Sequence, residues 1–213
     1  MSTERFIYLT VFTLAFLIGI FSYKYHKALK ILLGVMGLGL FVEYLVEINK
    51  YWGLATEPYL YNIYIPLEYF LYASFFYVLN TGRRYLRKGI LISVPVFLLV
   101  ILLSLEIPLL NDKLITFVYT VSGILICTWS IWTLFVIKPL EGRKFVAHPL
   151  IWICGGLIIF YSGITPFNIA YNILLVRPES LELLSTIIQK GFNIFLYTSI
   201  GIGFVCSHRM KIS

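Results

Sequence analysis

Long runs of apolar residues, each bounded by charged or turn-forming residues, follow one another along the whole chain. A transmembrane helix needs about 20 mostly apolar residues at a rise of about 1.5 Å per residue, and the runs have this length. They predict seven transmembrane helices, at residues 5–23, 28–49, 59–80, 88–106, 114–137, 149–175 and 182–206. The expected fold class is an all-α membrane protein in which residues 1–213 form one seven-helix transmembrane domain.

The composition supports a membrane location. Of the 213 residues, 60% are hydrophobic and 13% are charged, which leaves too little polar surface for a soluble globular domain. The formal net charge of +7 comes from small basic clusters that lie between the apolar runs. We therefore expect membrane lipids as partners and no nucleic acid, and we expect a multi-pass protein of a bacterial inner membrane.

The basic residues also indicate the orientation of the chain. Twelve of the 17 lysines and arginines lie near the links after the first, third and fifth helices or at the C-terminus. Because cytoplasmic links are enriched in Lys and Arg, this predicts an N-terminus outside and a C-terminus inside the cytoplasm. The densest cluster is Arg83, Arg84, Arg87 and Lys88. It fits a topology signal, and a contact with lipid headgroups or with a cytoplasmic partner is the alternative.

Four charged side chains fall inside predicted membrane helices: Glu43, Glu47, Glu68 and Lys190. A charge at mid-membrane costs roughly 2.5–3.5 kcal/mol on insertion scales, so each one is a candidate functional residue. Glu43 and Glu47 are four residues apart and share one helix face. Glu68 and Lys190 each lie about 12–14 Å from the outer surface at 1.5 Å per residue. We expect these two side chains to form an ion pair.

Other polar side chains gather at the same depth in the outer half. On the third helix, Tyr61, Glu68 and Tyr72 recur at helical spacing with Tyr64 and Ile65 between them, which predicts a polar face toward the bundle interior. Such groups either join helices by hydrogen bonds or line a cavity open to the outside. The candidate set for binding a ligand or an ion is Glu43, Glu47, Glu68, Lys190, Asn62, Asn168, Asn172, Asn193 and Tyr72.

A shift of 125 residues suggests an internal repeat. It lays residues 69–74 over residues 194–199 with four of six positions identical. The same shift pairs Glu43 with Asn168, Glu47 with Asn172, and Glu68 with Asn193. Helices one to three would then repeat as helices five to seven in the same orientation, with the fourth as a linker, which is a parallel three-one-three arrangement.

Two families resemble this layout. The seven-helix sugar transporters have a three-one-three arrangement, but they carry prolines in their first two helices, and related proteins carry a Pro-Gln pair. This chain has neither, so the resemblance is one of architecture. Microbial rhodopsins carry a seventh-helix lysine and a third-helix carboxylate. That resemblance implies retinal bound to Lys190 with Glu68 as counter-ion. An acidic residue one turn before the lysine is replaced here by Thr186.

The run Asn62-Ile63-Tyr64-Ile65-Pro66-Leu67-Glu68 and the stretch from Asn193 to Phe204 resemble a group of bacterial seven-helix integral membrane proteins. This similarity covers about two helices. It implies a fold and no particular activity.

Enzymatic chemistry is not expected. The three histidines, His26, His148 and His208, all fall at predicted cytoplasmic helix ends, whereas a membrane zinc enzyme needs several ligands within the bundle. The leading hypothesis is a non-enzymatic transporter or channel-like carrier of a small solute, ion or proton, without cofactor or metal. A receptor that signals to a separate cytoplasmic partner is the alternative, followed by the retinal protein. A homo-oligomer is compatible with this interpretation.

Overall fold

The computed structural model describes residues 3–22, 27–54, 57–106, 114–137, 145–173 and 179–211. Within these ranges the chain is all-helical, which confirms the predicted α class, and each long helix overlaps one predicted span. The helices are α1 (Thr3–Ser22), α2 (Lys27–Tyr51), α3 (Glu57–Leu79), α4 (Arg84–Glu106), α5 (Leu114–Phe135), α6 (Pro149–Ile173) and α7 (Glu179–Lys211), with the short 3₁₀ helix η3 (Phe145–Ala147) before α6.

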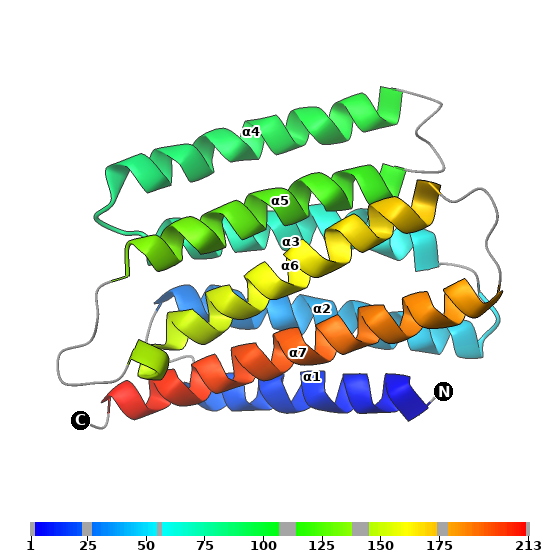
Figure 1. Ribbon diagram of the computed structural model, residues 1–213, viewed down its shortest axis with the longest axis horizontal. Coiled ribbons are helices and arrows are strands. Elements are labelled where there is room, and N and C mark those ends of the chain that lie inside the picture. The colour runs from blue at the N-terminus through cyan, green and yellow to red at the C-terminus, as the bar shows by residue number, and fades with distance from the viewer. Residues whose placement is uncertain are drawn as a thin grey trace.

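The long helices lie side by side and run back and forth along one axis (Figure 1). The N-terminus and the C-terminus lie at opposite ends of this bundle. We use these termini to name the two ends. The N-terminal end holds the beginnings of α1, α3, α5 and α7 and the last turns of α2, α4 and α6.

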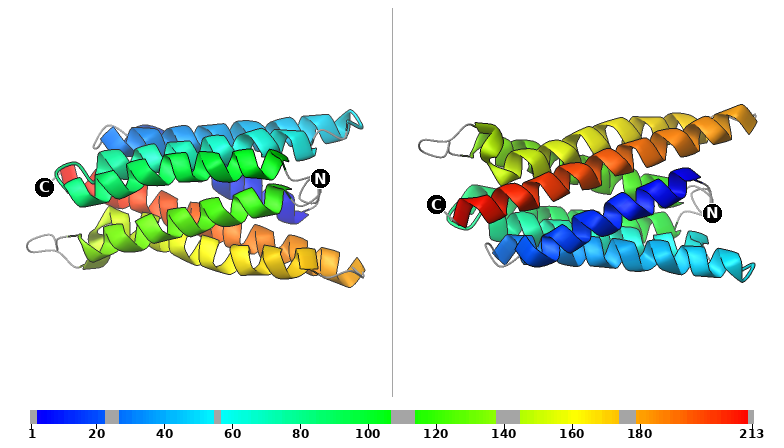
Figure 2. Two further views of the ribbon diagram at one scale, coloured as in Figure 1. Left: turned by 90° about the horizontal axis from the view of Figure 1, so that it is seen from above. Right: turned by 90° about the horizontal axis from the view of Figure 1, so that it is seen from below.

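Six of the helices close a ring. Neighbours pack in the order α1, α2, α3, α5, α6, α7 and back to α1. The remaining helix, α4, packs against α3 and α5 at the edge of the bundle, as Figures 1 and 2 show. The ring therefore encloses an interior that α4 does not reach.

In the described part of the chain, five helices are long and apolar enough to cross a membrane: α1, α2, α4, α5 and α6. This supports a multi-pass membrane protein. The helices α3 and α7 fall short because they carry more polar residues. Examples are Glu68 and Asn62 on α3, and Gln189 and Asn193 on α7.

The ring interior differs between its two halves. Toward the C-terminal end it is filled by large apolar side chains that are at most 1% exposed, among them Leu32, Met36, Phe75, Phe76 and Phe204. Such close packing leaves no room for a ligand. Space remains in the half toward the N-terminal end.

Candidate functional site

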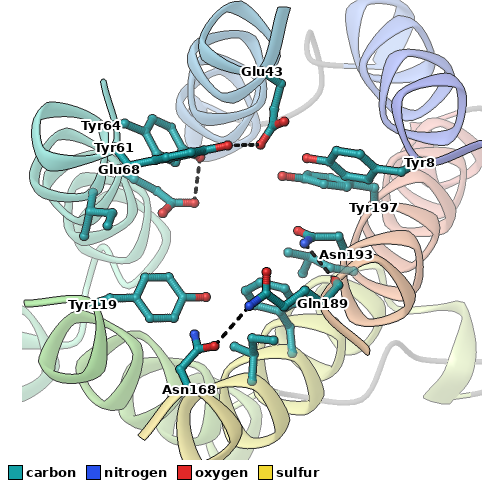
Figure 3. A pocket seen from close by; sticks show the side chains of 14 residues that line it. Tyr8, Glu43, Tyr61, Tyr64, Glu68, Tyr119, Asn168, Gln189, Asn193 and Tyr197 are labelled. Atoms are coloured by element: carbon teal, nitrogen blue, oxygen red, sulfur yellow. Dashed lines mark hydrogen bonds between the residues drawn. The ribbon is translucent and has the colours of Figure 1, made fainter. Parts of the chain in front are cut away.

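A cavity of about 390 Å³ lies within the ring (Figure 3). Its lining residues on α1, α2, α3, α5 and α6 lie toward the N-terminal end of the bundle. Each of the six ring helices contributes to its wall. The volume falls in the range of small-molecule pockets, about 300–1,000 Å³. The described lining residues are Tyr8, Glu43, Tyr61, Tyr64, Ile65, Glu68, Tyr119, Phe160, Ile164, Asn168, Gln189, Asn193, Leu196 and Tyr197.

One face of α3 forms a large part of the wall. Tyr61, Tyr64, Ile65 and Glu68 are spaced by three, one and three residues, so they share a single helix face, and all four line the cavity. These are four of the five residues that the sequence places on the polar face of this helix. Asn62 was included in the candidate set but is exposed on the outside of the bundle, because its position is turned about 100° away from Tyr61 at 3.6 residues per turn.

The two lining carboxylates each accept a tyrosine hydroxyl. Tyr64 donates to Glu68 Oε1 at 2.9 Å, and Tyr61 donates to Glu43 Oε1 at 3.1 Å (Figure 3). The first bond lies within α3, whereas the second joins α3 to α2. Of the candidate residues, Glu43 and Glu68 thus both line the cavity.

Two adjacent charged residues in the first turn of α1, Glu4 and Arg5, form ion pairs with the neighbouring helices α7 and α2. Arg5 Nη2 lies 3.4 Å from Glu43 Oε2, and Arg5 Nε pairs with Glu47. The contact of one arginine with both carboxylates confirms that Glu43 and Glu47 share a face. Glu47 is not among the described lining residues, and its carboxylate pairs with Arg5.

Lys190 has a different partner from the expected one. Its ammonium lies 3.3 Å from Glu4 Oε2, next to the Arg5 cluster, and Lys190 is not among the described lining residues. The predicted ion pair with Glu68 was based on the depth of the Lys190 backbone, which does not locate the ammonium group. A lysine side chain extends toward water from a buried backbone position, which places its charge farther out.

Amide side chains from α6 and α7 form the opposite wall. Gln189 Nε2 donates to Asn168 Oδ1 at 3.3 Å, and Asn193 Nδ2 donates to the Gln189 carbonyl oxygen at 2.9 Å. Of the candidate residues, Asn168 and Asn193 also line the cavity. The side chain of Asn172 lies outside the part of the chain that the structure describes.

Aromatic rings close the cavity toward the apolar half. Tyr197 stacks on Phe12 with ring centroids 3.5 Å apart and an angle of 12° between the planes. Tyr72 was predicted as a site residue, but it is 2% exposed and is not among the described lining residues. It lies one turn beyond Glu68, where the ring interior is already filled, so it belongs to the core.

The basic cluster divides into two pairs. Arg83 donates to the carbonyl oxygen of Val136 at the end of α5 and to Asn80 Oδ1, and the Arg87 guanidinium lies 4.0 Å from the centroid of the Tyr77 ring. These two side chains hold the helix ends. Arg84 and Lys88 are exposed and remain accessible to lipid headgroups or to a partner.

Several polar cavity residues lay outside the candidate set. These are Tyr8, Tyr61, Tyr64, Tyr119, Tyr197 and Gln189. Tyrosine is common in membrane helices, so its presence in the sequence gives no signal of a site. Tyr61 and Tyr64 had a usable signal, their place on the predicted polar face of α3.

The described residues contain no group of three or more His, Cys, Asp or Glu side chains placed to hold a metal ion. No protein-family model, curated protein or solved structure matches this chain.

Proposed function

We propose that this protein is a non-enzymatic membrane carrier in which all seven long helices cross the bilayer and a small solute or ion binds in the ring cavity. The observation that carries this proposal is a polar cavity with two carboxylates, Glu43 and Glu68, enclosed by six helices. A protein that used these groups for packing alone would fill the space between them.

The outward face of α3 supports a membrane-spanning position for it. Its exposed side chains include Ile63 and Leu67, whereas Tyr64 and Glu68 face the cavity. Lipid meets the apolar face and not the polar one, so the average composition of α3 understates its fit to a bilayer. Its 23 residues extend about 34 Å at 1.5 Å per residue, enough for the apolar core of a membrane.

The distribution of basic residues also favours seven membrane crossings over five. If α3 crosses, the cluster at 83–88 lies on the same side as the basic residues near Lys27 and Lys30. If α3 does not cross, that cluster moves to the opposite side, against the tendency of basic links to stay in the cytoplasm. Seven crossings therefore place the C-terminal end in the cytoplasm and the cavity toward the outside.

The hydrogen bond of Glu68 argues for binding over packing. Its described hydrogen-bond donor, Tyr64, is on the same helix, so this bond does not join two helices. By contrast, Asn168 and Gln189 do join α6 to α7 without a charge. A buried carboxylate that costs roughly 2.5–3.5 kcal/mol to insert and ties no helices together is best explained by a ligand or a proton.

Cysteine labelling tests whether α3 crosses the membrane. In a background without the three native cysteines, Leu54→Cys and Thr81→Cys mark the two ends of α3, and both native side chains are exposed. With seven crossings, an impermeant maleimide added to intact cells labels only Leu54→Cys, and Thr81→Cys reacts after permeabilisation. Labelling of both in intact cells would overturn the position of α3. The termini alone do not distinguish five crossings from seven, since both numbers are odd.

Transport is tested in proteoliposomes with solid-supported membrane electrophysiology and an internal pH dye, using a panel of cations and neutral solutes. Glu68→Gln keeps the shape of the side chain and removes its charge, so we expect loss of the wild-type flux. Asn62→Ala, on the outward face of the same helix, is the matched control and should keep it. Equal flux in wild type and Glu68→Gln would contradict the proposal. Solute binding without flux in the wild type would instead support a receptor.

A further inference from the structure

The lining of the ring cavity has an uneven charge. Its described residues include the carboxylates of Glu43 and Glu68 and no lysine, arginine or histidine. The nearest described cation on the Glu43 side, Arg5, contacts both Glu43 and Glu47. Glu4 and Lys190 balance each other. One arginine against three carboxylates leaves the cluster of Arg5, Glu43, Glu47 and Glu68 formally negative by two charges, which excludes anionic ligands and attracts cations.

Aromatic rings form a large part of the walls. Six of the fourteen lining residues are rings, namely Tyr8, Tyr61, Tyr64, Tyr119, Phe160 and Tyr197. They come from five different ring helices, so they surround the space instead of forming one stack. Aromatic faces attract cations through their quadrupole, and cages of such rings suit quaternary and other organic ammonium groups.

The same lining suits a metal ion poorly. Calcium needs six to eight oxygen ligands and magnesium near-ideal octahedral oxygen geometry. Here one oxygen of each lining carboxylate already accepts a tyrosine hydroxyl, and Ile65, Ile164 and Leu196 occupy other parts of the wall. An organic cation uses both features, because its charge meets a carboxylate and its carbon atoms meet the rings.

We propose that the cavity binds a small organic ammonium ion, with Glu68 as its counter-charge and the tyrosine rings as its walls. In Figure 3 the Glu68 carboxylate and the Tyr119 hydroxyl point into the same space, and Tyr8 and Tyr197 face it from the other side. Glu43 is partly neutralised by Arg5, which leaves Glu68 as the main charge for the ligand. This inference rests on the proposed function for the ligand's entry, but binding can be measured without transport.

The experiment compares two probes of the same shape in isothermal titration with the full-length protein in lipid nanodiscs. Choline carries a quaternary ammonium, and 3,3-dimethylbutan-1-ol replaces that nitrogen with carbon. We expect saturable binding of choline and at least about tenfold weaker binding of the alcohol. Equal affinities would overturn the proposal, and so would the absence of binding by choline, tetramethylammonium and methylammonium together. This comparison needs no variant, so it does not depend on a mutant that folds.

Variants then assign the binding to the cavity. Glu68→Gln should weaken choline about tenfold or more and leave the alcohol unchanged. Tyr119→Phe keeps the aromatic face and should retain choline affinity, whereas Tyr119→Leu should reduce it severalfold. Choline affinity unchanged in both Glu68→Gln and Tyr119→Leu would move the site elsewhere and overturn the proposal. Choline binding without any flux would refute the carrier function alone, whereas flux of another solute without ammonium binding would refute this inference alone.

Discussion

The contact between α6 and α7 at Gly156 allows a quantitative prediction. A Cβ atom at Gly156 would lie 2.7 Å from Ser199 Cβ, where ordinary contact begins at 3.4 Å, so Gly156→Ala forces the two helices apart by about 0.7 Å. The blocking atom is a Cβ fixed to the backbone, and Ser199 is buried, so no side-chain rotation relieves the clash. Overpacking costs about 1–3 kcal/mol and the helix propensity of alanine returns up to about 1 kcal/mol. We expect a net loss of about 1–2 kcal/mol.

The neighbouring glycine is the control. A Cβ at Gly155 would meet nothing within 4 Å, so Gly155→Ala should leave stability unchanged or raise it. For a chain of this length, about 1–2 kcal/mol lowers the melting temperature by about 2–8 °C. The assay is thermal unfolding of purified protein in one detergent, followed by the loss of the monodisperse peak in gel filtration. If Gly156→Ala melts at the temperature of Gly155→Ala, the close packing of α6 on α7 is refuted.

Three further predictions use the same melting assay. Arg83→Ala should cost about 1.5–3 kcal/mol because its charged hydrogen bonds hold the end of α5, whereas the exposed Arg84→Ala should stay within about 0.5 kcal/mol; equal effects would contradict this. Tyr69→Phe and Ser93→Ala both remove the same 2.7 Å bond between α3 and α4, and Ser93→Ala also removes the bond within α4 from Ser93 to the Ile90 carbonyl oxygen. The loss of about 0.6 kcal/mol from the shared bond should therefore be counted only once in the double variant. Burial lowers the pKa of His148, whose Nδ1 accepts a backbone N–H at the start of α6. The unfolded chain then takes up a proton first, so stability should fall as the pH drops below about 6.5, and His148→Asn, which keeps an acceptor, should flatten this fall.

The sequence predicted the helices because length and apolar content decide what a membrane helix needs, and these are local properties. It also predicted the cavity face of α3, since residues three and four apart share a face wherever the helix packs. It failed for Asn62 because this residue was chosen for its depth in the membrane, without asking which side of the helix it occupies. It failed for the partner of Lys190 because a long side chain can carry its charge far from its Cα. The aromatic lining from Tyr8, Tyr119 and Tyr197 depends on which helices meet, and a local pattern does not contain that information.

The internal repeat stays a prediction, with two observations in its favour. The shift of 125 residues pairs Glu43 with Asn168 and Glu68 with Asn193, and all four side chains line the cavity. The ring order α1, α2, α3, α5, α6, α7 also keeps its sequence when the first three helices are exchanged for the last three. Paired polar positions on opposite sides of one cavity are what two parallel halves would produce.

Low hydropathy and the cavity are two results of the same arrangement of residues. The two helices that fall short of the composition of a membrane span, α3 and α7, supply eight of the fourteen described lining residues. Each sits in the ring with α1 or α2 on one side and α5 or α6 on the other, so its polar face meets the cavity and not lipid. The mean hydropathy of a whole helix combines this hidden polar face with the exposed apolar face, so it does not distinguish between them. In a ring of helices around a polar cavity, the helices that contribute most to binding are therefore the ones that composition alone is least able to place in the membrane.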